Sequence, residues 1–223
     1  MKTKGIERLV VKVGTGFLFD KLKNNMCVLR PHQMAGLVGE MAKISENREI
    51  VLVSSGAIAT AAWKFKMPVP RDQYERARLS GIGQPYLMGL YGKEFGKYGK
   101  KTAQFLICSD DLKNPKSKKN IIRNQEAYFR EGVIGVYNEN DLMAIDEITF
   151  GDNDILAAHL ACCLNADLLV MLSDAKEGLG TGGGKSKQEA EKIVRERGIG
   201  MRILNNGYKF HKRKYLPNIT KIL

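Results

Sequence analysis

The stretch RLVVKVG, residues 8–14, is a short apolar run that ends in glycine. Continuous apolar runs of this length are typical of strands that are buried on both faces. Such runs recur along the chain and alternate with segments whose apolar residues have helical spacing. We expect strands at 8–14, 49–56, 102–107, 133–138, 167–174 and 201–206, and helices at 31–47, within 72–98, and at 119–132, 152–166 and 185–198. This alternation predicts an α/β fold, with a mainly parallel sheet covered by helices on both faces.

The amino-acid composition indicates an ordinary globular protein, since 43 % of the 223 residues are hydrophobic and 27 % are charged. No apolar run is long enough to span a bilayer, and the start, MKTKGIERLVVKVG, has too short an apolar run for a signal peptide. The four cysteines form no C-x-x-C pair, which favours reduced thiols. We therefore expect a cytoplasmic protein.

The charge is unevenly distributed. The whole chain has a formal net charge of +12, yet residues 131–175 contain nine carboxylates and no lysine or arginine. A basic protein with one acidic segment could bind nucleic acid through its basic face. It could equally hold cations in the acidic segment while lysines elsewhere hold phosphates.

Polar residues follow the predicted strands. The strand ends read KVGTG, VSSGA, YNEND and MLSDA. In open α/β sheets, ligands bind beyond the carboxyl ends of the strands. Glycines, hydroxyls, amides and carboxylates at these positions predict a polar ligand site.

Two of these strand ends suit anions. Lys12 lies inside an apolar strand just before Gly14, and a lysine there is costly unless it meets an anion. The alternative is a lysine on an edge strand that faces water. Ser54, Ser55 and Gly56 form a strand-to-helix junction, where free N–H groups attract anions, although a helix cap would also explain one serine.

The segment GTGGGKSK, residues 180–187, precedes a predicted helix. Consecutive glycines let a backbone fold closely around phosphate, and Lys185 or Lys187 would add charge. A Walker P-loop is excluded because its first glycine would fall at Leu179. A flexible linker is the alternative.

The stretch NENDLMAIDEITFGDND, residues 138–154, holds six carboxylates and no lysine or arginine. Asp141 and Asp154 flank a predicted hairpin at 142–150, and Asn138 and Asn153 supply amides. Carboxylates suit Mg²⁺ and ammonium groups, while amides suit a carboxylate. A solvated acidic loop is the alternative. Together with the lysines and glycines, this stretch favours phosphoryl transfer, which depends on positioning and charge neutralisation.

The chain resembles the amino acid kinase family, and within it the members that phosphorylate glutamate. The motifs that carry the resemblance, within residues 7–187, are VVKVGTG, VLVSSGAIA, GIGQPYLM, VYNENDLMAIDEITFGDND, LLVMLSD and GTGGGKSK. The resemblance implies a three-layer αβα sandwich and a single domain over residues 1–223. It also implies transfer of the ATP γ-phosphoryl group to the side-chain carboxylate of L-glutamate, with Mg²⁺, as the first step of proline biosynthesis. A homo-oligomer is expected.

The resemblance also implies roles for individual residues. Lys12, Lys187 and Asp154 would be catalytic, and Ser55, Asn138, Asp141 and Asn153 would bind glutamate. The residues beside the nucleotide would be Lys12, Gly14, Ser173, Asp174, Gly182, Gly183, Gly184 and Lys187. The sequence does not identify direct ligands of Mg²⁺.

The chain departs from the family in two places. The family has several further elements between the segments that here meet at Leu179 and Gly180. Either this protein lacks them or residues are missing there, and we expect the second. The C-terminal PUA-type domain of some members does not follow. Two alternatives remain: a relative that acts on another carboxylate, carbamate or phosphate, or an inactive regulatory or nucleic-acid-binding relative, for which the basic runs KNPKSKK and KFHKRK are the motive.

Overall fold

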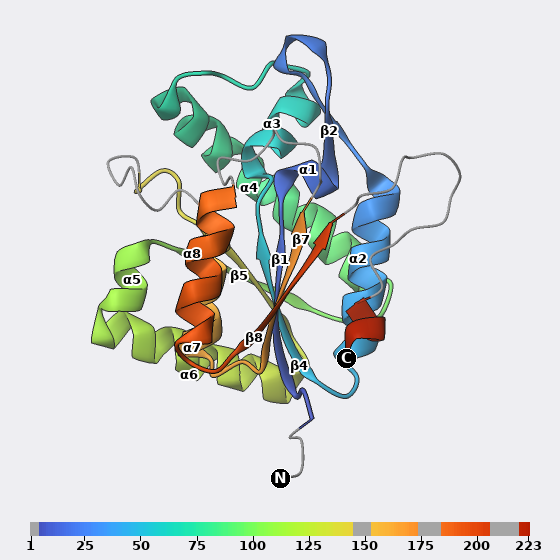
Figure 1. The fold of residues 1–223 in the computed structure, drawn as a ribbon. Coiled ribbons are helices and arrows are strands. Elements are labelled where there is room, and N and C mark those ends of the chain that lie inside the picture. Colours follow the sequence, from blue (N-terminus) through green and yellow to red (C-terminus); the bar gives the residue numbers. More distant parts are fainter. Residues whose placement is uncertain (1–4, 145–152, 174–183, 206–218) are drawn as a thin grey trace.

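The structure, a computed structural model, describes residues 5–144, 153–173, 184–205 and 219–223 (Figure 1). Most of the hairpin predicted at 142–150 lies outside these ranges, as do Asp174, Gly182 and Gly183. The junction of Leu179 and Gly180 also lies outside them.

The described chain contains a six-stranded sheet in the order β5-β6-β4-β1-β7-β8, and every neighbouring pair is parallel. The strands are β1 (Arg8–Val13), β4 (Glu49–Ser54), β5 (Thr102–Ile107), β6 (Ile134–Glu139), β7 (Leu168–Ser173) and β8 (Gly200–Asn205). The predicted parallel α/β fold is therefore confirmed, with each strand within about one or two residues of its expected bounds.

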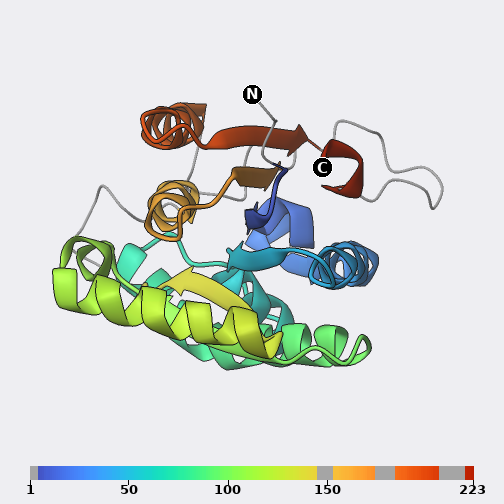
Figure 2. The same cartoon turned by 90° about the horizontal axis from the view of Figure 1, so that it is seen from below.

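Helices cover both faces of this sheet, which gives the expected three layers. Figures 1 and 2 show α2 on one side of the strands and α7 and α8 on the other. The first side also carries α3 and α4, and the second also carries α5 and α6. The helices are α1 (Thr15–Leu18), α2 (Pro31–Ile44), α3 (Ala57–Phe65), α4 (Gln73–Gly96), α5 (Ser109–Lys113), α6 (Pro115–Glu131), α7 (Asn153–Cys163) and α8 (Gly184–Arg195).

Strand β1 lies in the middle of the sheet and separates two cores. Leu9, Val11 and Val13 pack into the core on the α2–α4 side, whereas Val10 packs into the core beneath α7. Successive strand residues point to opposite faces, so Lys12 points to the α7 side with Val10.

Some elements were not expected from the sequence. The short strands β2 (Phe19–Lys21) and β3 (Cys27–Leu29) form an antiparallel hairpin around the 3₁₀ turn η1 (Lys23–Asn25). A second 3₁₀ turn is η2 (Ile219–Ile222). The basic run KNPKSKK ends α5 and begins α6. Asn114 caps α6 by accepting hydrogen bonds from the backbone N–H groups of Lys116 and Ser117. Helix α6 therefore begins four residues before its expected start.

Within the described ranges, no helix combines the length and apolarity needed to cross a membrane. All four cysteines are free thiols.

Candidate active site

Lys12 is a buried lysine in the central strand. It is only 7 % exposed and lies in register with Val53 of β4 and Met171 of β7. The alternative of an edge-strand lysine facing water is therefore wrong. Its amine forms an ion pair with Asp154, which explains how the sheet accommodates the charge.

Asp154 joins three distant parts of the chain. It is fully buried in the first turn of α7, and its Oδ2 accepts hydrogen bonds from Lys187 Nζ at 2.9 Å and Ser186 Oγ at 3.2 Å. Lys187 and Ser186 come from the first turn of α8. The structure thus brings Lys12, Asp154 and Lys187 together at the carboxyl end of the sheet.

The two lysines keep this buried carboxylate ionised. Burial acts to raise the pKa of Asp154, but the charge of Lys12 and the hydrogen bonds from both lysines outweigh it and hold the pKa below its ordinary value. One carboxylate between two ammonium groups leaves one positive charge in excess. The group can therefore attract an anion such as a phosphate.

Beside the lysines lies a cluster of hydroxyl and amide groups. Asn153 Nδ2 donates to Asn138 Oδ1 at 2.8 Å and to Ser55 Oγ at 3.1 Å. The backbone N–H of Glu139 donates to Asn138 Oδ1 at 2.9 Å and to Asn153 Oδ1 at 3.3 Å. Ser55, Asn138 and Asn153, which the sequence analysis assigned to one substrate, therefore lie together.

Strand order explains this grouping. Asn138 is on β6, Ser55 directly follows β4, and Lys12 is on β1, and these three strands are neighbours in the sheet. The N–H of Ser55 donates to Val13 O at 3.0 Å, which ties the serine to the end of β1. Gly56 then turns the chain into α3 with a φ of +112°, a conformation that favours glycine.

Asp141 follows β6 and faces α4. There Ser80 and the charge of Arg76 both act to lower its pKa. Burial outweighs both and raises the pKa of Asp141. Asp141 is thus close to Asn138 in sequence, but it lies against α4, whereas Asn153 of the hydroxyl–amide cluster belongs to α7.

The described residues assigned to the nucleotide lie around Lys12 and the start of α8. The N–H of Gly14 donates to Leu172 O at 3.1 Å, and a Cβ built on Gly14 would lie 3.8 Å from Lys12 Nζ. Ser173 is the last residue of β7, and Gly184 opens α8 with open space where a side chain would be.

Two contributors were missed by sequence reasoning. Ser186 binds Asp154, and its place between Lys185 and Lys187 in the glycine segment was the available signal. The buried Glu139, whose N–H positions both asparagines, stood in the acidic stretch but was not singled out.

No group of three or more histidines, cysteines or carboxylates that could hold a metal occurs among the described residues. Both oxygens of Asp154 already meet lysine amines. The described side chains alone therefore do not form a metal site.

Sequence comparison identifies the family to which this fold and site belong. The pattern of the amino acid kinase family matches residues 7–205, and this chain belongs to that family. Two similar proteins are glutamate 5-kinases. That of Anaeromyxobacter dehalogenans is 40 % identical over 173 residues, covering 76 % of this chain and 45 % of the relative. That of Dictyoglomus thermophilum is 37 % identical over 228 residues, covering 87 % of this chain and 60 % of the relative.

A solved structure supports the fold. The isopentenyl phosphate kinase of T. acidophilum, in a product complex, superposes with a TM-score of 0.58 at 15 % identity, covering 89 % of this chain and 91 % of that one. At this identity the likeness establishes the shared fold.

Proposed function

We propose that this chain is the catalytic part of an ATP-dependent kinase that phosphorylates the side-chain carboxylate of L-glutamate and yields glutamyl 5-phosphate, the first step of proline biosynthesis. The observation that carries the proposal is Asp154, which joins Lys12 and Lys187 and adjoins Asn153 of the hydroxyl–amide cluster. The similarity to two glutamate 5-kinases supports the choice of substrate.

The lysines would act on the transferring phosphoryl group. Charge on its oxygens is neutralised by Lys12 and Lys187, and Asp154 holds the two amines in place. Gly14, Ser173 and Gly184 would lie beside the nucleotide, together with Asp174, Gly182 and Gly183 from outside the described ranges.

The polar cluster would hold glutamate. The amide groups of Asn138 and Asn153 and the hydroxyl of Ser55 can bind a carboxylate, while Asp141 can accept a hydrogen bond from the ammonium group. In this role the half-buried Asp141 gains a positive partner when the substrate arrives. This partner would offset the burial that raises the pKa of Asp141.

The reaction needs no general base. An oxygen of the glutamate carboxylate, already anionic at neutral pH, attacks the γ-phosphorus of ATP. The bond from that phosphorus to the β–γ bridging oxygen breaks, and its electron pair leaves with ADP. Mg²⁺ would enter with the ATP phosphates, because it binds substrate phosphates in such sites and keeps several waters.

The chain spans 45 % and 60 % of the lengths of the two relatives, so its place in a longer protein belongs to the proposal. The D. thermophilum match runs over 228 positions, more than the 223 residues of this chain, so the relative has residues within the match that this chain lacks. The expected gap between Leu179 and Gly180 stays a prediction. A single domain over residues 1–223, a homo-oligomer and a cytoplasmic location remain predictions.

Formation of glutamyl hydroxamate tests the function. The full-length protein is incubated with Mg-ATP, hydroxylamine and, in separate reactions, L-glutamate, L-aspartate, N-acetylglutamate or carbamate, and ADP release is measured in parallel. We expect both products with glutamate, and much less with N-acetylglutamate, which lacks the ammonium group. ADP release with carbamate or aspartate, but not with glutamate, would assign the chain to another branch of the family.

A further inference from the structure

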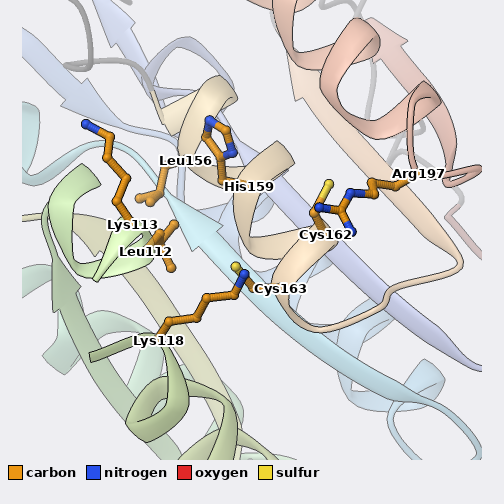
Figure 3. A pocket seen from close by; sticks show the side chains of 8 residues that line it. All are labelled: Leu112, Lys113, Lys118, Leu156, His159, Cys162, Cys163 and Arg197. Atoms are coloured by element: carbon orange, nitrogen blue, oxygen red, sulfur yellow. The ribbon is translucent and has the colours of Figure 1, made fainter. Parts of the chain in front are cut away.

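A pocket lies on the α5–α8 side of the sheet. It has a volume of about 130 Å³ and is formed by α5, α6, α7 and the turn after α8 (Figure 3). Helix α7 contributes His159, Cys162 and Cys163 to its wall. None of Lys12, Asp154, Ser186 and Lys187 lines it, so this pocket is distinct from the lysine–aspartate centre.

The charged side chains that line this pocket are all cationic, while Glu189 acts on His159 and Glu196 on Cys162 from outside the lining. The cations are Lys113, Lys118 and Arg197, and no carboxylate contributes to its lining. Lys113 is paired with Asp110 at 3.0 Å. Among the residues that the structure describes, neither Lys118 nor Arg197 forms an ion pair with a carboxylate.

These two cations face thiols instead. Figure 3 shows the Lys118 amine beside the Cys163 sulfur and the Arg197 guanidinium beside Cys162. Burial raises the pKa of both thiols, although Lys118 and Arg197 act to lower it. The thiols are therefore neutral at pH 7 and do not neutralise the cations.

Apart from His159, the remaining wall of the pocket is apolar. Leu112 and Leu156 contribute aliphatic carbon, and a neutral thiol packs as a small apolar group. Pockets that bind small molecules are typically apolar with a few placed polar groups. Here the placed groups are a point charge from Lys118 and the planar, bidentate donor of Arg197.

We propose that this pocket binds a small organic anion, a molecule with a short apolar body and one or two carboxylate or phosphate groups. The apolar body would lie against Leu112, Leu156 and the thiols. The anionic groups would take the positions beside Lys118 and Arg197. Carboxylates and phosphates share this chemistry, and binding assays with one probe of each kind separate them.

Calorimetric titration of the full chain tests the proposal, with succinate as the dicarboxylate and glycerol phosphate as the phosphate ester, at constant ionic strength. At least one probe should bind saturably. Lys118→Gln and Arg197→Gln should each weaken binding at least tenfold. Lys119→Gln is the matched control, because Lys119 is an exposed neighbour on α6 that does not line the pocket, and it should leave the affinity unchanged.

The rate of cysteine alkylation, with and without the probe, is a second measurement that needs no variant. The bound probe should slow alkylation of Cys162 by iodoacetamide severalfold and leave Cys108, which does not line the pocket, unaffected. The proposal is overturned if neither probe binds saturably. It is also overturned if Lys119→Gln weakens binding as much as Lys118→Gln, or if Lys12→Ala abolishes binding while Lys118→Gln does not, because the anion would then occupy the catalytic centre.

Discussion

Lys187 Nζ lies 2.9 Å from Asp154 Oδ2, although the two residues are 33 positions apart and belong to different helices. The other oxygen of the same carboxylate meets Lys12 from the central strand. Removing one member of such a buried ionic group leaves the others without their counter-charge, which gives the centre its testable properties.

Asp154→Asn should lower the free energy of unfolding at pH 7 by about 3–5 kcal/mol, because it leaves two lysines near a buried amide. The pKa of Asp154 is depressed in the folded protein, so its contribution is complete above the unfolded value of about 3.9 and is lost as the pH falls through the folded value. The difference in free energy of unfolding between wild type and variant should therefore become smaller as the pH falls below about 4. Urea denaturation at several pH values measures it, and a gap that stays constant from pH 7 to pH 3 would contradict the ionised role of Asp154.

Lys12→Ala should reduce kcat by roughly 10²- to 10³-fold, the usual loss when one group that stabilises transition-state charge is removed. Lys187→Ala should reduce it similarly. Steady-state ADP release measures both, and circular dichroism checks that the fold is kept. Lys119→Ala, an exposed lysine on α6, should retain wild-type turnover. Full activity of Lys12→Ala would remove this lysine from the mechanism.

Ser55→Ala should raise KM for glutamate roughly ten- to hundredfold and leave KM for ATP nearly unchanged, since a hydrogen bond to a charged group contributes about 1.5–3 kcal/mol and about 1.4 kcal/mol is tenfold. The variant removes the oxygen that accepts from Asn153 and leaves the two asparagines in contact. Ser117→Ala, on the outer helix α6, is the matched control. If KM for ATP rises and KM for glutamate does not, Ser55 belongs to the nucleotide side.

Asp141→Asn should stabilise the substrate-free protein at neutral pH while raising KM for glutamate at least tenfold. The pKa of Asp141 is raised by burial, so the folded state holds the proton more tightly than the unfolded state does. The contribution of Asp141 to the free energy of unfolding therefore falls as the pH rises through its unfolded and folded pKa values. Asparagine does not ionise, so the variant avoids this loss. Thermal unfolding at pH 5 and pH 8, with and without glutamate, measures the effect. A variant less stable than wild type at pH 8 would show that Asp141 is a structural partner of Arg76.

Gly83→Ala should lower the free energy of unfolding by about 1–3 kcal/mol or more, because the close packing of α3 against α4 depends on it. A Cβ at Gly83 would lie 1.9 Å from the carbonyl oxygen of Ala57, and backbone atoms cannot move aside cheaply. Gly89 is in the same helix, and a Cβ there meets nothing within 4 Å. Gly89→Ala should therefore stabilise the protein by up to about 1 kcal/mol through helix propensity. Equal effects of the two changes in urea denaturation would contradict this packing.

The sequence by itself determined the class of fold and most of the candidate site. Continuous apolar strands such as 8–13 can be buried only in a sheet covered on both faces, and helical segments between them supply that cover. The residues themselves marked Lys12, Asp154 and Lys187 as candidates, and the resemblance to the amino acid kinase family implied their catalytic roles.

Only the tertiary structure decided how these residues meet. The order β6-β4-β1-β7 puts Asn138, Ser55 and Lys12 at adjacent strand ends, and that order depends on crossovers that local sequence does not encode. The hairpin of β2 and β3 escaped prediction because three-residue strands show no reliable periodicity. The pairing of the buried charges likewise required coordinates, because the pKa of Asp154 follows from the distances to two amines brought from opposite ends of the chain.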